Sequence, residues 1–258
     1  MRSALIGYTG FVGSNLDRQH KFSHRFNSKN IDEIDGKEFD LIVCAGVPAI
    51  KWMANKEPKA DWDSIERLLT HLNETTAERF ILISTIDVYP QIAGVDEGSP
   101  IDPSLNHAYG RHRFLVEEFV RRTFPIRHIV RLPGLFGAGL KKNVIFDLLN
   151  DNCLELVNSA SSYQYYPLNR LWNDLRTVTA SDLELVNFAT EPIATSDIIG
   201  AFFADKLSRI GATAVGEAHY DILTRHADTF GRDGGYMLGR DAVLGPLGKF
   251  VKDYPAAP

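Results

Sequence analysis

Short, continuous apolar runs alternate with stretches of helical periodicity along the first half of the chain. The apolar runs predict strands at residues 3–8, 39–45, 79–84 and 126–132, and a more polar stretch at 24–27 is a weaker strand candidate. Runs that are apolar throughout are typical of parallel strands buried on both faces of a sheet. Between the runs, apolar residues at helical spacing predict helices at 11–20, 61–73 and 106–122. This order predicts the α/β class, with a doubly wound parallel sheet.

The alternation becomes less regular after Pro133. Residues 90–103 are rich in Gly, Pro, Asp and Ser and predict a loop. Further helices are predicted at 144–149, at 196–207 with Thr195 or Ser196 as its cap, and at 241–251 with an interruption at Gly245-Pro246. Further strands are predicted at 154–157, 183–188 and 220–223. We expect residues 1–135 to form the sheet domain. Residues 136–258 then form mainly a small C-terminal lobe over its ligand-binding edge, with segments that return to the sheet.

Composition excludes some classes of function. The 258 residues are 44% hydrophobic and 24% charged, which is ordinary for a globular protein. A formal charge of −5 leaves no basic surplus, so we expect no nucleic-acid partner. No apolar run approaches the roughly 18 residues that span a bilayer, and the first residues read as a strand rather than a signal peptide. We therefore predict a cytoplasmic protein with no membrane partner.

The two cysteines do not indicate a metal site. Cys44 and Cys153 lie far apart, and neither belongs to a C-x-x-C pair. Cys44 lies in an apolar run, where a buried structural thiol is the ordinary interpretation. We expect free thiols in a reducing compartment and no bound metal.

A glycine-rich loop follows the first predicted strand and opens the first predicted helix. It reads Gly7-Tyr8-Thr9-Gly10-Phe11-Val12-Gly13. Glycine permits a sharp turn and a close approach to a pyrophosphate, and the unpaired N–H groups of a helix start favour an anion. A purely structural turn is the alternative, but the strand before and the helix after favour a dinucleotide-binding loop. We expect NAD(P) to be bound by Gly7, Thr9, Gly10, Phe11, Val12 and Gly13. Ala45, Gly46 and Pro133 each follow a strand and are further candidates for the cofactor site.

The end of the second predicted strand indicates which dinucleotide the site prefers. An acidic residue usually stands there and holds the ribose diol of NAD. The stretch Phe26-Asn27-Ser28-Lys29-Asn30 has no acidic residue. Asn27, Ser28 and Lys29 offer polar and cationic groups to a 2′-phosphate, although a solvated surface lysine explains Lys29 equally well. We predict NADP as the cofactor, with NAD as the alternative.

Three further segments follow in order along the chain. They are Ser84-Thr85-Ile86-Asp87-Val88-Tyr89, Tyr109-Gly110-Arg111-His112-Arg113, and Arg131-Leu132-Pro133-Gly134-Leu135-Phe136-Gly137-Ala138-Gly139. Together with the glycine loop, they resemble the motifs of the extended short-chain dehydrogenases/reductases, which include sugar-nucleotide epimerases, dehydratases and reductases. The resemblance runs from residue 1 to about residue 200. It implies a Rossmann fold, with an NAD(P)-binding domain at 1–135 and mainly a substrate-binding lobe at 136–258.

The resemblance assigns the chemistry to Tyr109 and Thr85. A phenol titrates near pH 10, and a nearby cation lowers that pKa. Residues 109 and 113 lie one turn apart on the same helix face. The family has a lysine where this chain has Arg113, which keeps the charge but cannot relay a proton. We expect Tyr109 as the acid/base, Thr85 as a hydrogen-bond partner of the same substrate oxygen, and Arg113 as the cation, with Tyr109 and Arg113 also contacting the cofactor. Taken alone, Tyr109 would be an ordinary helix tyrosine.

The resemblance also implies contacts with a nucleotide-sugar substrate. Lys142 and Asn143 precede a predicted helix where similar enzymes contact a diphosphate, and a solvated basic turn is the alternative. Gln164 begins a segment similar to the family's Q-F-x-x-V-x-D-L, with Arg170 in place of the aspartate. The expected substrate-binding residues are Thr85, Asp87, Lys142, Asn143 and Gln164. By analogy, a homodimer would form through the helices at 61–73 and 106–122.

Two hypotheses of function follow. The first is an NAD(P)-dependent oxidoreductase, epimerase or dehydratase that acts on a nucleotide sugar or a related carbonyl substrate. The second is a non-catalytic NAD(P)-binding sensor or regulatory protein, which Arg113 favours. No nucleophile elbow or metal-ligand spacing supports a hydrolase.

Overall fold

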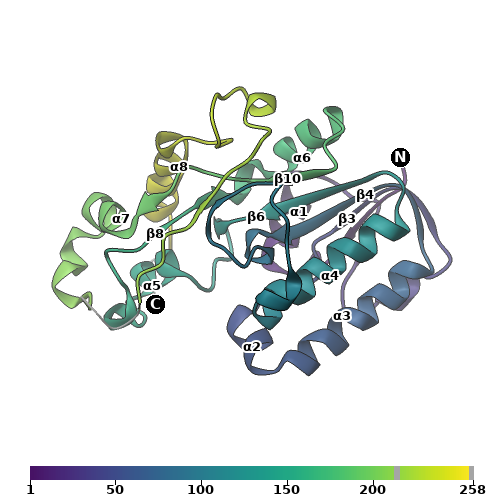
Figure 1. Ribbon diagram of the computed structural model, residues 1–258, viewed down its shortest axis with the longest axis horizontal. Helices are drawn as coiled ribbons and strands as arrows, with labels where there is room; N and C mark the ends of the chain where they lie inside the picture. The colour runs from purple at the N-terminus through teal and green to yellow at the C-terminus, as the bar shows by residue number, and fades with distance from the viewer. Residues whose placement is uncertain (212–215, 256–258) are drawn as a thin grey trace. The chain divides into compact units, whose positions relative to one another are not determined.

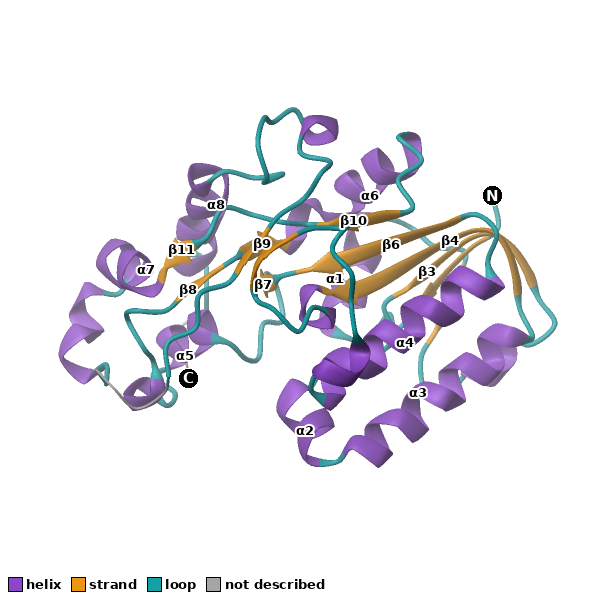
Figure 2. Ribbon diagram, in the orientation of Figure 1, coloured by secondary structure: helices purple, strands orange, loops and turns teal. Residues whose placement is uncertain are grey.

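A six-stranded parallel sheet organises the first of two units in the chain. The computed structural model describes residues 1–211 and 216–255 (Figures 1 and 2). Unit 1 comprises Met1–Gln91, Glu97–Leu132 and Asn169–Asn187, and unit 2 comprises Ile92–Asp96, Pro133–Leu168 and Phe188–Pro258. Among the described residues, no helix has the length and apolar character needed to cross a membrane.

The sheet of unit 1 confirms the predicted fold class. Its strand order is β10-β6-β4-β3-β1-β2, and every neighbouring pair is parallel. The strands are β1 (Ser3–Ile6), β2 (His24–Phe26), β3 (Glu38–Cys44), β4 (Thr76–Thr85), β6 (Arg127–Leu132) and β10 (Leu185–Asn187). The strand order reverses at β1, with β2 on one side and β3 on the other. In open α/β sheets, ligands bind at such a reversal, beyond the carboxyl ends of the strands.

Helices cover both faces of this sheet. Figure 1 shows α3 (Pro58–Asn73) and α4 (Ala108–Thr123) side by side on one face, with the short α2 (Lys51–Lys56) before α3. Helices α1 (Phe11–Gln19) and α6 (Leu171–Ala180) pack against one another, and His20 after α1 stacks on Trp172.

The core explains why the strand sequences are apolar throughout. On the α3/α4 side, Ile6, Ile42 and Leu82 of the sheet pack in one cluster with side chains of both helices. The alternate residues Leu5 and Val43 point the other way and are also buried. Both faces of the strands are therefore removed from water, as the sequence pattern predicts.

The two cysteines are free thiols, as predicted. Cys44 is buried in the core, and burial raises the pKa of its thiol to about 11. It is therefore an inert packing residue. In the described part of the chain, no three His, Cys, Asp or Glu side chains are grouped to hold a metal ion.

Unit 2 combines helices with strands of two or three residues. Its helices are α5 (Val144–Asn150), α7 (Thr195–Phe202) and α8 (Arg240–Lys252). Three strand pairs join distant segments: β7 (Gly134–Phe136) with β9 (Tyr165–Pro167), β8 (Ser162–Tyr163) with β11 (Ile193–Ala194), and β5 (Ala93–Val95) with β12 (Asp221–Ile222).

Several sequence predictions in the second half need correction. Residues 154–157 form a 3-10 turn instead of a strand, because Leu154 and Val157 are buried at helical spacing while Leu156 is exposed. The residue that caps α7 is Ala194, not Thr195 or Ser196. Pro246 lies inside α8 without ending it. The residue four positions earlier, Ala242, is exposed, so water can satisfy its freed carbonyl.

Candidate functional site

The register of the sheet brings the predicted cofactor residues to one edge. Ile6 at the end of β1 pairs with Phe26 of β2 and with Cys44 of β3. The segments that follow these strands start at Gly7, at Asn27 and at Ala45, so they lie along the same carboxyl edge. Thr85 ends β4 at this edge too.

Backbone geometry shows why Gly7 and Gly13 are needed in the loop after β1. Gly7 has a φ of +85°, and a Cβ there would lie 2.4 Å from the carbonyl oxygen of Ala45. A Cβ on Gly13 would lie 2.0 Å from the carbonyl oxygen of Gly7. Gly13 therefore lets the first turn of α1 pack directly on the loop, and only glycine fits at either position.

The start of α1 is open to an anion. Gly10 is the N-cap residue of α1 and has no side chain to bond the first N–H groups of the helix. Thr9 and Gly10 are exposed, and Phe11 and Val12 are partly exposed. The loop therefore presents helix N–H groups behind a backbone without side-chain obstruction, which is the arrangement that holds a pyrophosphate.

A tight turn follows β2. The side chain of Asn27 accepts a hydrogen bond from the backbone N–H of Lys29 (2.8 Å), and the Asn30 side chain accepts one from the N–H of Asn27 (2.8 Å). Ser28 and Lys29 are exposed at the tip. Arg67 of α3 reaches this turn, and its Nη2 donates to the carbonyl of Ser28 (3.3 Å). Sequence reasoning missed Arg67 because it lies 39 residues from Ser28. It adds a second cation beside Lys29.

Thr85 and Tyr109 meet at the end of β4. Tyr109 lies in the first turn of α4, is only 7% exposed, and forms a side-chain hydrogen bond with Thr85. Thr85 also accepts a hydrogen bond from the backbone N–H of Asp87 (3.1 Å). Asn106 anchors the segment after Thr85, because its amide donates to the carbonyl of Asp87 (2.9 Å). A Cβ on Gly110 would lie 2.1 Å from that same carbonyl, so Gly110 permits this close approach.

The net electrostatic effect on Tyr109 differs from the sequence-based expectation. Burial raises the pKa of its phenol, and the carboxylate of Asp87 raises it further. Arg113, Lys51 and the Thr85 hydrogen bond lower the pKa but do not outweigh these effects. The cation at residue 113 therefore acts in the predicted sense, yet the phenol of Tyr109 is protonated at neutral pH.

Arg113 shares the face of α4 with Tyr109, as its spacing predicts, and its guanidinium is engaged with protein groups. It is 4% exposed and forms a bidentate pair with Asp61 of α3 (2.5 and 2.8 Å). It also donates to the backbone carbonyls of Pro48 and Tyr109. Its Cζ lies 4.1 Å from the centre of the Tyr109 ring. Arg113 thus joins three segments of unit 1.

Asp61 accepts from two residues of α4. Besides Arg113, His112 bonds its carboxylate through Nδ1 (2.8 Å). Burial opposes ionisation of Asp61, but the bonds from Arg113 and His112 prevail and hold its pKa below the usual value. His112 is thereby placed in a structural contact between α3 and α4.

Two ionisable residues that the motifs do not include lie beside Tyr109. Lys51, the first residue of α2, pairs with Asp87 (Nζ to Oδ1, 2.8 Å). His107 caps α4, where its Nδ1 accepts the N–H of Gly110 (3.0 Å). Burial and then the charge of Lys51 lower the pKa of His107, so the ring is neutral at pH 7 and carries its proton on Nε2.

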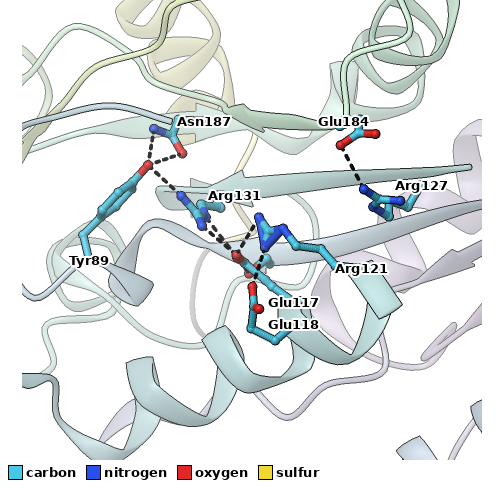
Figure 3. A network of polar contacts seen from close by, with 9 residues as sticks. Tyr89, Glu117, Glu118, Arg121, Arg127, Arg131, Glu184 and Asn187 are labelled. Atoms are coloured by element: carbon cyan, nitrogen blue, oxygen red, sulfur yellow. Dashed lines mark hydrogen bonds and ion pairs between the residues drawn. The ribbon is translucent and has the colours of Figure 1, made fainter. Parts of the chain in front are cut away.

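A buried network of ion pairs and hydrogen bonds contacts the end of β4 (Figure 3). Glu117 of α4 is fully buried and forms a bidentate pair with Arg131 of β6 (2.9 and 2.6 Å). Ser84, which precedes Thr85, donates to the same carboxylate (2.6 Å). Arg131 also donates to the hydroxyl of Tyr89 (2.6 Å), which contacts Asn187 of β10. The network links β4, β6, β10 and α4, and it reaches β4 at Ser84, the residue before Thr85.

The remaining predicted residues belong to unit 2. Asn143 caps α5 through its side chain, which accepts from the N–H of Phe146 (3.1 Å) and donates to the carbonyl of Leu135 (2.8 Å). Lys142 is exposed, and Pro133 is buried. Gln164 is 1% exposed; its amide nitrogen donates to the backbone carbonyls of Thr190 and Ile222, and its amide oxygen accepts from the N–H of Ile222. In this structure, Gln164 therefore connects segments of unit 2.

No family model and no curated protein sequence matches the chain. Solved structures do match it. One is a NAD-dependent NDP-hexosamine 5,6-dehydratase of tunicamycin biosynthesis, TunA, with 17% identity, a TM-score of 0.75 and coverage of 99% of both chains. A second is a dTDP-4-dehydrorhamnose reductase from Yersinia enterocolitica, with 15% identity, a TM-score of 0.70, and coverage of 99% of this chain and 100% of the other. A third is a UDP-N-acetylglucosamine 4-epimerase from Methanobrevibacter ruminantium, with 14% identity, a TM-score of 0.69 and 97% coverage of both chains. The chain shares their fold, which confirms the Rossmann architecture expected from its motifs.

Proposed function

We propose that this protein is an NAD(P)-dependent oxidoreductase, epimerase or dehydratase that acts on a nucleotide sugar or a related carbonyl substrate. The observation that carries the proposal is the hydrogen-bonded pair of Thr85 and Tyr109, at the same sheet edge as the glycine loop. The names of the structural neighbours support the same class of reaction and substrate.

The glycine loop fits a dinucleotide. Gly7 and Gly13 clear space that a Cβ would fill, and the helix start behind Gly10 offers N–H groups to a pyrophosphate. Ala45 and Gly46 lie against the loop, and we assign them to the nicotinamide side of the site. The bound cofactor would supply or accept a hydride.

Tyr109 is the proposed acid/base. Its phenol is protonated at neutral pH, so it can donate its proton to the oxygen of a substrate carbonyl as that oxygen gains charge. Thr85 hydrogen-bonds Tyr109 and is positioned to hold the same oxygen. In the reverse direction, the phenolate would accept the proton of a substrate hydroxyl. Asp87 is the proposed substrate contact on the following turn, and Lys142 and Asn143 are proposed contacts for the diphosphate.

NADP is the proposed preferred cofactor. Lys29 and Arg67 provide two cations at the turn after β2, where a 2′-phosphate of the adenosine ribose would lie. Changing Lys29 to Glu should weaken NADPH binding by about tenfold or more and affect NADH binding much less, because only NADPH carries the extra phosphate. Equal losses for both dinucleotides would contradict this assignment.

Activity is tested by incubating the protein with NAD(H) or NADP(H) and a panel of UDP- and dTDP-sugars, with products identified by mass spectrometry. We expect turnover of at least one sugar nucleotide by the wild-type protein. Tyr109→Phe should abolish that turnover and leave dinucleotide affinity within about twofold, because only the transferable proton is removed. Tyr254→Phe, which removes a hydroxyl that contacts Asn150, is the matched control.

A non-catalytic NAD(P)-binding role is the second candidate. The engagement of Arg113 with Asp61 favours it, because the guanidinium is held by protein groups at the position where the resembling family has its lysine. Saturable dinucleotide binding without turnover of any sugar nucleotide would select this role over the first.

A further inference from the structure

We propose that Lys51 is a second cation that assists Tyr109 together with Arg113, and that Arg113 also acts as a structural clamp. This inference rests on the proposed role of Tyr109 as the acid/base. It assigns a function to a residue outside all of the sequence motifs, and it accounts for an arginine at position 113.

The guanidinium of Arg113 is held by other groups of unit 1. Both terminal nitrogens of its guanidinium are bonded to Asp61, and the same nitrogens reach the backbone of Pro48 and of Tyr109. A planar guanidinium group that is paired in this way has its orientation fixed by three segments of the protein. Its charge is also matched at close range by the carboxylate of Asp61. Arg113 is therefore suited to holding α4 on α3 and on the loop after β3.

Lys51 is connected to Tyr109 through Asp87 and Thr85. Its ammonium contacts Asp87, Asp87 is bonded through its backbone N–H to Thr85, and Thr85 is bonded to Tyr109. Lys51 is 39% exposed, so its flexible side chain reaches the site from the solvent side. A lysine is unfavourable at the first residue of a helix, because the helix dipole is positive there. The stability of α2 therefore gives no reason for a lysine at this position, whereas the pairing with Asp87 does.

Charged groups of both signs act on the phenol of Tyr109. The groups that act on its phenol are Asp87 from the turn after β4, Arg113 from α4 and Lys51 from α2. His107 lies beside it and is neutral at pH 7. Asp87 opposes ionisation of the phenol, and Lys51 both offsets that carboxylate and favours the phenolate directly. Lys51 thus acts on Tyr109 through its charge, and it changes how readily the phenol loses and regains its proton.

The ionisation of Tyr109 tests this role without a substrate. The full-length protein is prepared with 3,5-difluorotyrosine at position 109, and the ring fluorines are followed by NMR across a pH titration. Fluorination makes the phenol more acidic, so it titrates while Lys51 is still charged. The variants are Lys51→Met, Lys51→Arg and Asp87→Asn, with Lys59→Met as the matched control, since Lys59 pairs with Asp63 and both side chains are exposed.

We expect Lys51→Met to raise the titration midpoint by about 0.5–1 pH unit, because a cation near the phenolate is removed. Lys51→Arg should restore the midpoint, Asp87→Asn should lower it, and Lys59→Met should leave it unchanged. A Lys51→Met midpoint equal to that of the wild type would overturn the proposal. So would a rise that Lys51→Arg does not reverse, because the effect would then not come from the charge.

Thermal melting tests the clamp. Arg113→Met should lower the melting temperature by about 6–15 °C, because it leaves the Asp61 carboxylate buried without its partner. Lys51→Met should change the melting temperature by no more than about 2 °C. A stable Arg113→Met protein would contradict the clamp. If the wild-type protein binds neither NADH nor NADPH, the proposed function fails, but the fluorine midpoints still decide whether Lys51 acts on Tyr109.

Discussion

Asp61 on α3 and Arg113 on α4 form a buried bidentate ion pair, with His112 as a second partner of the same carboxylate. Replacing Asp61 by Ala should lower the free energy of unfolding by about 3–5 kcal/mol, because Arg113 would remain buried without a counterion. Urea denaturation measures the change. Asp63→Ala on the same helix is the control, because Asp63 pairs with the exposed Lys59 and should cost no more than about 0.5 kcal/mol. Equal effects of the two substitutions would contradict the structural role of the pair.

The same pair makes stability depend on pH in a defined direction. Because the folded-state pKa of Asp61 is lowered, its contribution is fully present above the unfolded-state pKa, about 3.9. The contribution is lost as the pH falls through the lower, folded-state pKa. The difference in unfolding free energy between wild type and Asp61→Asn should therefore be present at pH 5 and shrink as the pH falls from 5 to below about 4. A difference that grows between pH 5 and pH 3 would have the wrong sign for this ion pair.

Two adjacent glutamates on α4 should differ sharply in their contribution to stability. Glu117 is fully buried against Arg131 and Ser84, whereas Glu118 is 40% exposed and pairs with Arg121. Glu117→Gln should lower the unfolding free energy by about 3–5 kcal/mol, and Glu118→Gln by less than about 1 kcal/mol. The two substitutions make the same chemical change, so chemical denaturation of both isolates the effect of burial. Similar losses would mean that the network of Glu117, Arg131 and Ser84 contributes little to the free energy of unfolding.

The sheet and the glycine loop were predictable because their signals are local. The apolar runs at 39–45 and 79–84 predict strands that the structure places at Glu38–Cys44 and Thr76–Thr85. The loop from Gly7 to Gly13 spans seven residues, and its turn and its close contact with α1 depend on Gly7 and Gly13. The spacing of Tyr109 and Arg113 likewise places both on one face of a helix, which the structure bears out.

The partners of these residues were not predictable, because they come from distant parts of the chain. Asp61 lies 52 residues from Arg113, and Lys51 lies 36 residues from Asp87. No periodicity or motif relates such positions. The helices α5, α7 and α8 of unit 2 were predicted, but most of its strands were missed for a different reason. Its strands are two or three residues long, which is too short for an alternating pattern, and each depends on a partner elsewhere in the unit.

Dinucleotide binding by the glycine loop underlies the proposed chemistry, and a fluorescence titration measures it. NADPH and NADH are titrated separately into the wild type, Gly13→Ala and Gly200→Ala, and the nicotinamide emission is followed. Gly200 lies exposed in α7, where an added Cβ meets no atom within 4 Å of the described structure, so Gly200→Ala is the matched control. We expect saturable binding by the wild type and Gly200→Ala, with NADPH preferred. Gly13→Ala should bind at least about tenfold more weakly, because its Cβ collides with the loop backbone. Absence of binding by the wild type, or unchanged binding by a folded Gly13→Ala protein, would show that the glycine loop does not hold a dinucleotide.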